Sequence, residues 1–566
     1  MKVQRAVLVA ASIVAATVLP PAAEAASLDD FKQIVVIYQE NHSFDNLYGL
    51  WGTVEGKAVD GLPNADPAHT TQVRQDDRTP YSCLLQNDVN LVSPPLPAAC
   101  TDSTGAPFQS AFRNEPFDID EYIKPAATTC PVPGTFAPHG MADGKGLLGG
   151  CTRDLVHRFY NEQYQINRGN QNRYVTGSDA AGLVMGHYDT TRLPIYRYLH
   201  RDGAPHYVIA DRFFQAAFGG SFLNHQWLVA AATPVFAGAA NDGGPNDLHA
   251  IVDVNGMPAS TPLYTSPLGL SPNDPSTLSA SCNPPAGRPA TPAGIVCGDW
   301  AVNTMQPFHW PFAPGTPDAR RLPPLSHPTI GDRLNDAGVD WAWYSGGWSN
   351  ANGDIGAPGW TNGNGPTCGD PNADPRPGFP RCPDKLFQYH HQALNYFAAY
   401  APGTPSRRDH LRDEVEFIAS AKAGSLKPVS FVKPVGEENE HPGYASQPDG
   451  NDHLVALIDA VINGPQGQDT LVIVTYDEFG GQWDHVPPPP NGRADPGQYA
   501  HDQWGPGTRI PALLIAKRFT RSAVDRTDAY DTTSILKLIE DKYRLPPLTP
   551  RDKAARSLRG AVEAAN

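Results

Sequence analysis

Short runs of β-branched and aromatic residues recur along the chain, with helix-like segments between them. Near-continuous apolarity over a few residues is typical of strands that are buried on both faces of a sheet. The runs that predict strands are Gln33–Tyr38, Tyr207–Ala210, Val339–Tyr344, Pro428–Lys433, Thr470–Tyr476 and Ile510–Ala516. The segments that predict helices are Phe222–Ala232, Thr329–Ala337, Arg408–Ala423, Asn451–Ile462 and Thr533–Tyr543. Strands that alternate with helices predict an α/β fold, with a wound and mostly parallel sheet flanked by helices.

Three stretches interrupt this alternation and contain all eight cysteines: 52–155, 233–325 and 346–385. They are rich in Pro, Gly and Asn, so we expect loop insertions on one catalytic domain that spans 27–566. Neighbouring cysteines predict four disulfides on these loops, and a zinc site is the alternative, although no CxxC spacing supports it. The pairs, chosen by proximity from 105 connectivities, are Cys83 with Cys100, Cys130 with Cys151, Cys282 with Cys297, and Cys368 with Cys382.

The first 26 residues have the three-part pattern of a secretory signal peptide. Lys2 and Arg5 give a basic start, an apolar run follows from Ala6 to Leu19, and small residues lead to Ala26. A buried N-terminal helix is the alternative. Since no later stretch approaches the roughly 18 apolar residues of a membrane span, we expect a periplasmic or secreted protein with no transmembrane segment in the mature chain.

Composition and charge narrow the classes of partner. The chain has 43 Lys and Arg against 59 Asp and Glu, a formal net charge of −16, and 40% of its residues are hydrophobic. The hydrophobic share is enough for a sizeable core and excludes wholesale disorder. The acidic balance argues against nucleic-acid binding through phosphate neutralisation.

Acidic residues follow two of the predicted strands directly. Glu40 and Asn41 come after the first strand, and Asp477 and Glu478 come after the fifth. Open α/β sheets bind ligands at the carboxyl ends of their strands, and carboxylate and amide oxygens are ligands for divalent cations. We therefore favour a metal site. The alternative is that Ser43 caps a short helix and that the second cluster is a glycine turn.

A serine stands where a predicted helix begins. Ser221 follows two glycines, and His225 lies one turn further on. A helix N-terminus offers amides and a positive dipole end to a phosphate, and a serine there can act as a nucleophile if a metal activates it. A helix cap with a packed histidine is the alternative.

Four further histidines are candidates for the same site: His157, His390, His391 and His441. Imidazoles can donate to phosphoryl oxygens or protonate a leaving group near neutral pH. For each of them taken alone, a structural histidine is the alternative.

The strings IVVIYQENHSFDNLYG, TYDEFGGQWDHVPPP and GPGTRIPALLI resemble the bacterial phosphoesterase family, which contains secreted acid phosphatases and non-specific phospholipases C. The resemblance is colinear over about 31–545, and AFGGSFLNHQ, YHHQALNYF and ENEHPGYAS look like the acid phosphatase branch. It implies the alkaline phosphatase superfamily fold and Ser221 as the nucleophile. The implied holders of one divalent metal ion are Glu40, Asn41, Asp477 and Glu478, and the implied phosphate pocket has His157, His390, His391 and His441.

The function expected from the resemblance is that of a secreted, metal-dependent acid phosphatase. It would hydrolyse small-molecule phosphate monoesters through a phosphoserine, with an acidic optimum set by cationic imidazoles. The main alternative is a phospholipase C that cleaves phospholipid phosphodiesters. A phosphate-binding protein without turnover and a sulfatase are the remaining alternatives.

Overall fold

The computed structural model of the chain describes residues 27–73, 79–84, 98–101, 107–110, 112–132, 146–178, 181–235, 250–252, 296–298, 300–302, 304, 322–361, 386–443, 445–489, 502, 504–527 and 529–566. The predicted signal peptide 1–26 lies outside these residues. No described helix is both long and apolar enough to cross a bilayer.

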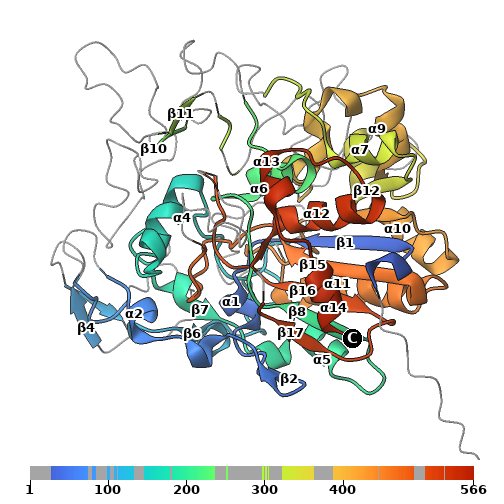
Figure 1. The fold of residues 1–566 in the computed structure, drawn as a ribbon. Helices are drawn as coiled ribbons and strands as arrows, with labels where there is room; N and C mark the ends of the chain where they lie inside the picture. The colour runs from blue at the N-terminus through green and yellow to red at the C-terminus, as the bar shows by residue number, and fades with distance from the viewer. Residues whose placement is uncertain are drawn as a thin grey trace, which may run out of the picture.

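An eight-stranded sheet forms the centre of the described structure (Figure 1). Its strands are β1 (Gln33–Gln39), β8 (His206–Ala210), β12 (Trp341–Ser345), β13 (Leu411–Asp413), β14 (Val429–Lys433), β15 (Thr470–Tyr476), β16 (Ala512–Ala516) and β17 (Ala523–Asp525). They lie in the order β13-β12-β14-β1-β15-β16-β8-β17. Only β16 runs antiparallel to its neighbours in this sheet. The predicted α/β fold with a mostly parallel sheet is confirmed.

Fourteen α-helices of the described residues accompany the sheet. They are α1 (Phe44–Tyr48), α2 (Pro67–Thr70), α3 (Ile119–Tyr122), α4 (Phe159–Ile166), α5 (Pro194–Leu199), α6 (Ser221–Ala230), α7 (Ile330–Asp336), α8 (Trp348–Asn352), α9 (Pro405–His410), α10 (Glu414–Ala423), α11 (Gln447–Ile462), α12 (Thr532–Tyr543), α13 (Pro550–Ala554) and α14 (Arg559–Ala564). Five short ladders complete the description: β2 (Thr53–Val54) with β3 (Lys57–Ala58), β4 (Ala98–Thr101) with β5 (Pro107–Ser110), β6 (Phe117–Asp118) with β7 (Gly186–His187), β9 (Phe213–Phe214) with β18 (Tyr530–Asp531), and β10 (Ala250–Val252) with β11 (Val296–Gly298).

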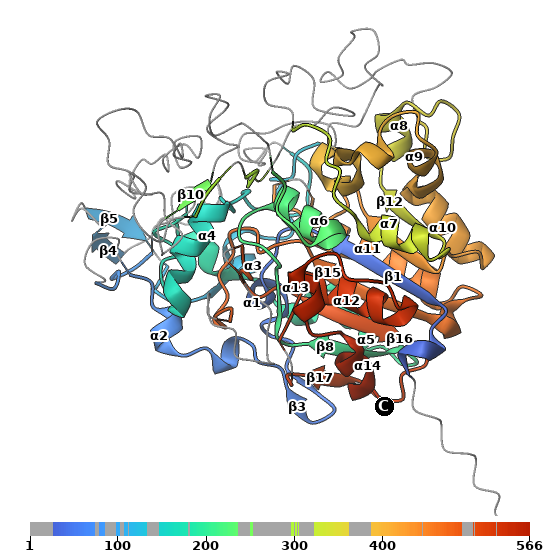
Figure 2. The same cartoon turned by 45° about the horizontal axis from the view of Figure 1, so that its top comes forward.

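Helices cover both faces of the sheet, as the alternation of side chains along β1 shows. Tyr38 donates its hydroxyl to the Asn224 carbonyl of α6, over 3.3 Å. The next residue, Gln39, donates to Glu440, which also accepts from Asn451 of α11. Because successive side chains of a strand point to opposite faces, α6 and α11 lie on opposite sides of β1. Figures 1 and 2 show α6 and α12 together above the strands.

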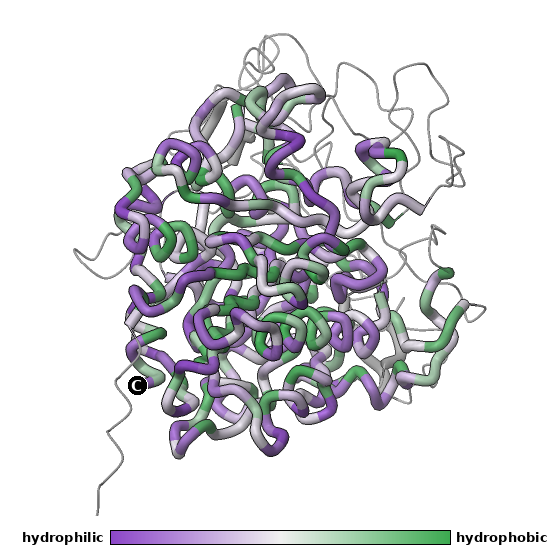
Figure 3. Tube along the Cα trace, turned by 90° about the vertical axis from the view of Figure 1, so that its right-hand side faces the viewer, coloured by the Kyte–Doolittle hydropathy of each residue, from purple (hydrophilic) through white to green (hydrophobic). Residues whose placement is uncertain are grey.

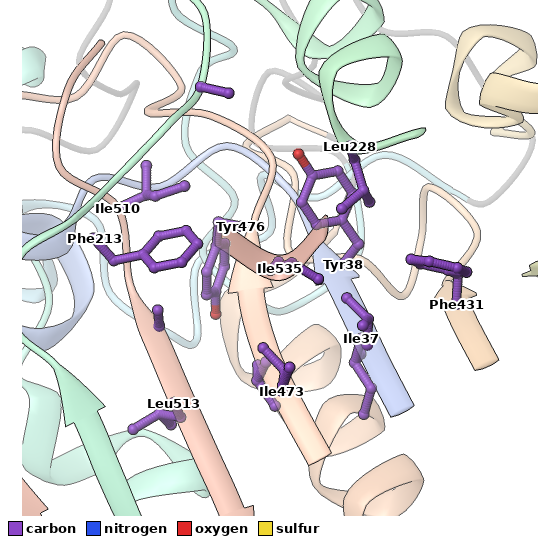
Figure 4. Close-up of a cluster of buried hydrophobic side chains, with 14 of the residues drawn as sticks. Ile37, Tyr38, Phe213, Leu228, Phe431, Ile473, Tyr476, Ile510, Leu513 and Ile535 are labelled. Carbon is purple, nitrogen blue, oxygen red and sulfur yellow. The ribbon is translucent and has the colours of Figure 1, made fainter. Parts of the chain in front are cut away.

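The core lies between the sheet and these helices. Figure 3 shows hydrophobic segments running through the middle of the molecule. In Figure 4, Leu228 of α6 and Ile535 of α12 lie beside Tyr38, and Ile37 and Ile473 project from β1 and β15. All five are essentially inaccessible to solvent. Burying each aliphatic side chain contributes about 1.5–3 kcal/mol, so the central strands are held firmly.

The six predicted strands are confirmed, and four of the five predicted helices are confirmed with shifted ends. Helix α11 begins earlier than expected because Ser446 caps it and Pro448 is tolerated in the first turn. The prediction of one helix over Arg408–Ala423 is wrong. There, Leu411–Asp413 pairs with β12, and the Asp413 carboxylate accepts from the Val415 amide, so that α10 begins anew.

The predicted disulfides are described only in part. Cys130 and Cys151 form a disulfide with a Cα–Cα distance of 4.8 Å, as predicted. Cys83 is also disulfide-bonded. Cys282, Cys368 and Cys382 lie outside the described residues, so the remaining pairings stay predictions. The same holds for much of the three predicted insertions and for the single-domain organisation over 27–566.

Candidate active site

The two acidic clusters converge at the carboxyl ends of neighbouring parallel strands. Glu40 and Asn41 follow β1, and Asp477 and Glu478 follow β15. The Asn41 amide donates to Asp477 Oδ1 over 3.1 Å. Asn41 has a φ of 58°, a left-handed conformation that Asn tolerates better than most residues. The β1–β15 pairing thus brings together residues far apart in sequence, as predicted.

Ser221 lies directly against these carboxylates. Its hydroxyl donates to Glu40 Oε2 over 3.2 Å and to Glu478 Oε1 over 3.5 Å. Ser221 is the first residue of α6, and Gly220 rather than Ser221 occupies the N-cap position. The capping role weighed for Ser221 is therefore absent. The next amide, that of Phe222, donates to the Thr304 carbonyl over 2.9 Å, so it is not available to a ligand.

Two histidines approach the site through Asn41. Asn41 Nδ2 lies 2.8 Å from His441 Nε2 and 3.4 Å from His157 Nε2. The opposite ring nitrogens face backbone carbonyls, at 2.7 Å from the Pro442 oxygen for His441 and 2.5 Å from the Leu155 oxygen for His157. A carbonyl can only accept, so both Nδ1 atoms carry the hydrogen, and in the neutral rings both Nε2 atoms face Asn41 as acceptors.

The other histidines lie on the Glu40 side. His391 Nε2 is 3.3 Å from Glu40 Oε1, and the His225 ring stacks on the His391 ring with centroids 4.8 Å apart. His225 Nδ1 contacts the Ser221 carbonyl oxygen at 2.7 Å. His390 packs against His391, with ring centroids 4.4 Å apart. The structure therefore gathers every residue that the sequence singled out for the site.

Lys433 is a site residue that the sequence analysis did not single out. It ends β14, its side chain is 1% exposed, and its ammonium pairs with Glu40 Oε1. Glu40 therefore directs one oxygen to Lys433 and the other to Ser221. A lysine at the end of a strongly apolar strand was the available signal, because strand ends at this edge of the sheet carry the site.

The site residues fit a divalent cation. Glu40, Asp477 and Glu478 are all fully buried, and within the described part of the chain Lys433 is the only lysine or arginine paired with them. Two fully buried ligand atoms, Asn41 Oδ1 and Asp477 Oδ2, have no hydrogen-bond partner among the described residues. Buried carboxylates need compensating charge. A cation held by the carboxylate and amide oxygens would supply it, and oxygen donors of this kind suit several divalent ions.

Burial and mutual repulsion dominate the electrostatics. Burial, followed by the Asp477 charge, raises the pKa of both Glu40 and Glu478, while Lys433 opposes the rise at Glu40. Burial also lowers the pKa of His390 to about 3 and that of His441 well below its ordinary value. The His390 imidazole is therefore neutral above pH 5 in the free protein, and burial shifts the His441 imidazole in the same direction. An acidic optimum from cationic imidazoles would require a bound phosphate to raise these pKa values.

The simpler interpretations of the two acidic strings also hold in part. Ser43 accepts from the Asn46 amide and caps α1, and Gly480 and Gly481 form a turn with φ values of 62° and 75°. These structural roles are compatible with the site, because Ser43 and the two glycines shape the backbone next to the residues that form it.

A sheet whose carboxyl edge presents a buried serine, carboxylates and imidazoles suits ester hydrolysis. The family model described as the phosphoesterase family matches residues 123–546. The chain belongs to the phosphoesterase family.

The relatives found by sequence carry phospholipase C names. Phospholipase C B of Mycobacterium tuberculosis (strain CDC 1551 / Oshkosh) is 22% identical over 546 residues, which cover 92% of this chain and 74% of the relative. Non-specific phospholipase C6 of Arabidopsis thaliana is 25% identical over 173 residues, 26% of this chain and 33% of the relative. Together with the family, these relatives identify the chain as a phosphoric ester hydrolase.

A solved structure is also similar. It is that of a protein in the alkaline phosphatase superfamily from Vibrio parahaemolyticus, with 13% identity, coverage of 41% of this chain and 51% of that chain, and a TM-score of 0.23.

Proposed function

We propose that Ser221 is the nucleophile of this phosphoric ester hydrolase. The observation that carries the proposal is its hydroxyl, placed 3.2 Å from Glu40 Oε2 and 3.5 Å from Glu478 Oε1 at the start of α6. A serine is a weak nucleophile until a base or a metal removes its proton. Carboxylates in this position can accept that proton or hold the ion that lowers its pKa.

We propose one divalent metal ion, held by Glu40, Asn41, Asp477 and Glu478. When bound, it would stabilise negative charge on the serine oxygen and on the phosphoryl group. The unpartnered Asn41 and Asp477 oxygens and the excess of buried carboxylates support this assignment.

The chain's own residues then divide the proton transfers. Ser221 attacks phosphorus in line with the leaving group and becomes a phosphoserine, and water hydrolyses that ester in the second step. The Nε2 atoms of His441 and His157 are unprotonated and face Asn41 Nδ2, so either ring would serve as the base for the attacking water by exchanging that contact for one to the water. His390 is our candidate for protonating the leaving alkoxide, a role that requires the bound phosphate to raise its pKa from about 3. His391 would orient Glu40.

For the substrate we place a phospholipid phosphodiester first, ahead of the monoester that the sequence resemblance suggested. A relative that spans 92% of the chain is named a phospholipase C, as are the shorter matches. Attack by Ser221 would release diacylglycerol and leave the phosphorylated headgroup on the serine. Water would then release that headgroup.

A phosphate monoester is the second candidate, as in an acid phosphatase. The observation in its favour is the gathering of four histidines around Asn41 and Glu40, of which Glu40 accepts from Ser221: His157, His390, His391 and His441. A monoester presents one more non-bridging oxygen than a diester, and additional imidazoles can serve it.

The test is turnover of p-nitrophenyl phosphate and p-nitrophenyl phosphorylcholine by wild type, Ser221→Ala and Ser430→Ala. Ser430 is the matched control, a fully buried serine on β14 whose hydroxyl has no described partner. We expect Ser221→Ala to lose at least ~10³-fold in kcat, Ser430→Ala to retain turnover, and the diester to be the better substrate. Faster turnover of the monoester would favour the acid phosphatase function over the phospholipase C function. Activity in Ser221→Ala would show that Ser221 is not the nucleophile.

We also propose export through the segment 1–26 and a single catalytic domain over 27–566. The signal-peptide pattern and the cysteine-rich loops support export. N-terminal sequencing of the secreted protein would test it, with a mature start at Ala26 or Ser27 expected.

A further inference from the structure

A further buried carboxylate, outside the proposed ligand set, contacts the turn before Ser221. Glu162 belongs to α4 and is fully buried. Within the described part of the chain it forms no ion pair. A buried carboxylate without a cation must be satisfied by hydrogen-bond donors. The identity of those donors shows what Glu162 does.

Glu162 accepts four hydrogen bonds, two on each oxygen. Oε1 accepts from the Thr508 amide at 2.7 Å and from the Thr508 hydroxyl at 2.9 Å. Oε2 accepts from the Gly219 amide at 2.5 Å and from Gln215 Nε2 at 2.9 Å. Since a backbone amide can only donate, both oxygens of Glu162 have to be acceptors.

These donors connect Glu162 to both halves of the site. Gly219 lies two residues before Ser221. Gln215 Oε1 accepts from the Phe479 amide over 2.9 Å, and Phe479 follows Glu478. One carboxylate therefore holds the turn that carries the serine and, through Gln215, the turn that carries Glu478.

The surrounding backbone is shaped to let this contact form. Gly219 has a φ of +90°, and a Cβ there would lie 2.5 Å from the Phe159 amide nitrogen at the start of α4. Gly507 passes equally close on the other side, where a Cβ would lie 2.3 Å from Glu162 Oε1. Neither position has room for a Cβ atom. The carboxylate of α4 therefore fits between the backbone at Gly219 and the backbone at Gly507.

We propose that Glu162 is a positioning residue for the nucleophile: it fixes Ser221 relative to Glu478 by holding both turns. The proposal rests on the proposed role of Ser221. Glu162 does not touch the serine oxygen, so its effect is on placement. A misplacement of about 1 Å can cost on the order of 10²-fold in rate.

Burial raises the pKa of Glu162 to about 8. A protonated carboxyl still serves both amides, because its hydroxyl can donate to Thr508 Oγ1 while each oxygen keeps a lone pair for a backbone N–H. Glutamine cannot do this. Its amide nitrogen must face either Gly219 or Thr508, which leaves one buried N–H opposite another donor.

The test compares Glu162→Gln with a matched control, Asp413→Asn. Asp413 is also buried and also accepts one backbone amide on each oxygen, from Ser349 at 2.9 Å and Val415 at 3.2 Å. It lies on β13, the edge strand four places from β15. Both variants lose the same kind of contact, but only one loses it at the site.

We expect Glu162→Gln to lower kcat by about 10- to 100-fold while KM changes by less than about threefold, at a temperature well below its Tm. Asp413→Asn should lower Tm and leave kcat within about twofold of wild type. A general structural role would instead give the two variants similar kcat values at matched fractions folded, and that result would overturn the proposal.

Glu162→Asp keeps the test open if the glutamine variant does not fold. It retains the carboxylate but shortens the side chain by one methylene, so it cannot reach both Gly219 and Thr508 without moving a turn. We expect reduced kcat here too, and wild-type kcat would contradict the proposal. Ser221→Ala, measured in parallel, separates the two claims: activity in that variant refutes the nucleophile, whereas an inactive Ser221→Ala with fully active Glu162 variants refutes the positioning role alone.

Discussion

The same two acidic strings build two buried clusters that have opposite character. The residues nearest the strand ends, Glu40 and Asp477, enter the active site. Residues a few positions later, Asp45 and Asp484, turn inward and meet Arg509. Both clusters are buried, and each contains ligand-type atoms within 4.8 Å of one another: those of Asp45, Asp484 and His485 in the inner cluster, and those of Glu40, His225 and His391 in the active site.

The two clusters differ in how their charge is balanced. In the inner cluster, Arg509 reaches Asp45 at 3.1 Å and Asp484 at 3.0 Å, and His485 adds a contact to Asp45 at 2.6 Å. In the active site, Lys433 is the only lysine or arginine among the described residues that pairs with one of the three carboxylates, and its partner is Glu40. A buried acidic cluster is therefore a candidate ligand site only where cations of the protein leave its charge unbalanced and its oxygens unpartnered.

The substitution with the greatest predicted effect removes one carboxylate from the active-site cluster. Asp477→Asn should lower kcat by about 10³-fold or more and weaken divalent-metal binding by at least about 10²-fold, because a ligand charge is lost. Titration calorimetry with Mg²⁺, Mn²⁺ and Ca²⁺ measures the binding. Asp45→Asn is the control from the inner cluster, and it should keep the metal affinity. Equal loss in both variants would erase the distinction.

Removing Arg509 from the inner cluster should lower the stability of the fold instead of the metal affinity. Arg509→Met leaves Asp484 buried without its cation and leaves Asp45 with His485 alone, and removal of one partner of a buried pair costs about 3–5 kcal/mol. Urea unfolding measures the loss. Metal affinity of the folded fraction should stay at the wild-type value, and a fall comparable with that of Asp477→Asn would contradict a purely structural role.

Metal removal should have an intermediate effect on stability. A metal present at 100 times its Kd stabilises the folded state by about 2.7 kcal/mol, so chelation should lower Tm by several degrees and remove turnover. Thermal unfolding with and without chelator measures this shift. Asp477→Asn should show almost none of it, and a full shift in that variant would place the metal elsewhere.

The weakest predicted effect is a pH dependence of the unfolding free energy that comes from His485 of the inner cluster. Burial alone would lower the pKa of His485, but its contact with Asp45 raises that pKa to about 10, above the ordinary 6.5. A raised pKa stabilises the fold fully below pH 6.5, and the stabilisation is lost as pH rises toward 10. Relative to His485→Gln, wild type should lose about 1 kcal/mol per pH unit between pH 7 and 9. If plots of the unfolding free energy against pH were parallel for the two proteins, the pairing of His485 with Asp45 would be contradicted.

Most of the sheet could be predicted from the sequence because strands buried on both faces consist of nearly continuous apolar residues. It did not predict β13 and β17, which are only three residues long and are defined by their pairing with β12 and β8. The continuous helix expected over Arg408–Ala423 fails for the same reason. Helical periodicity on both sides of Leu411–Asp413 concealed a strand that exists through a tertiary contact.

The site was predictable where function depends on strand ends. Glu40 and Asp477 could be found because each directly follows an apolar run. Lys433 and Glu162 could not be assigned roles, because their partners lie far away in sequence: Lys433 meets Glu40, and Glu162 meets Gly219. Nor does any local pattern show that the Asp484 charge is balanced, since its partner Arg509 comes from another strand connection.

The most direct test of the account is to trap the intermediate on Ser221. Wild-type protein mixed with p-nitrophenyl phosphorylcholine or p-nitrophenyl phosphate would be quenched in acid within one turnover and digested for peptide mass spectrometry. We predict an adduct on the peptide that contains Ser221, with the mass of a phosphorylcholine group from the diester or a phosphoryl group from the monoester, and no adduct in Ser221→Ala. An adduct on another residue, or rapid turnover with an unmodified Ser221 at every quench time, would show that Ser221 is not the nucleophile.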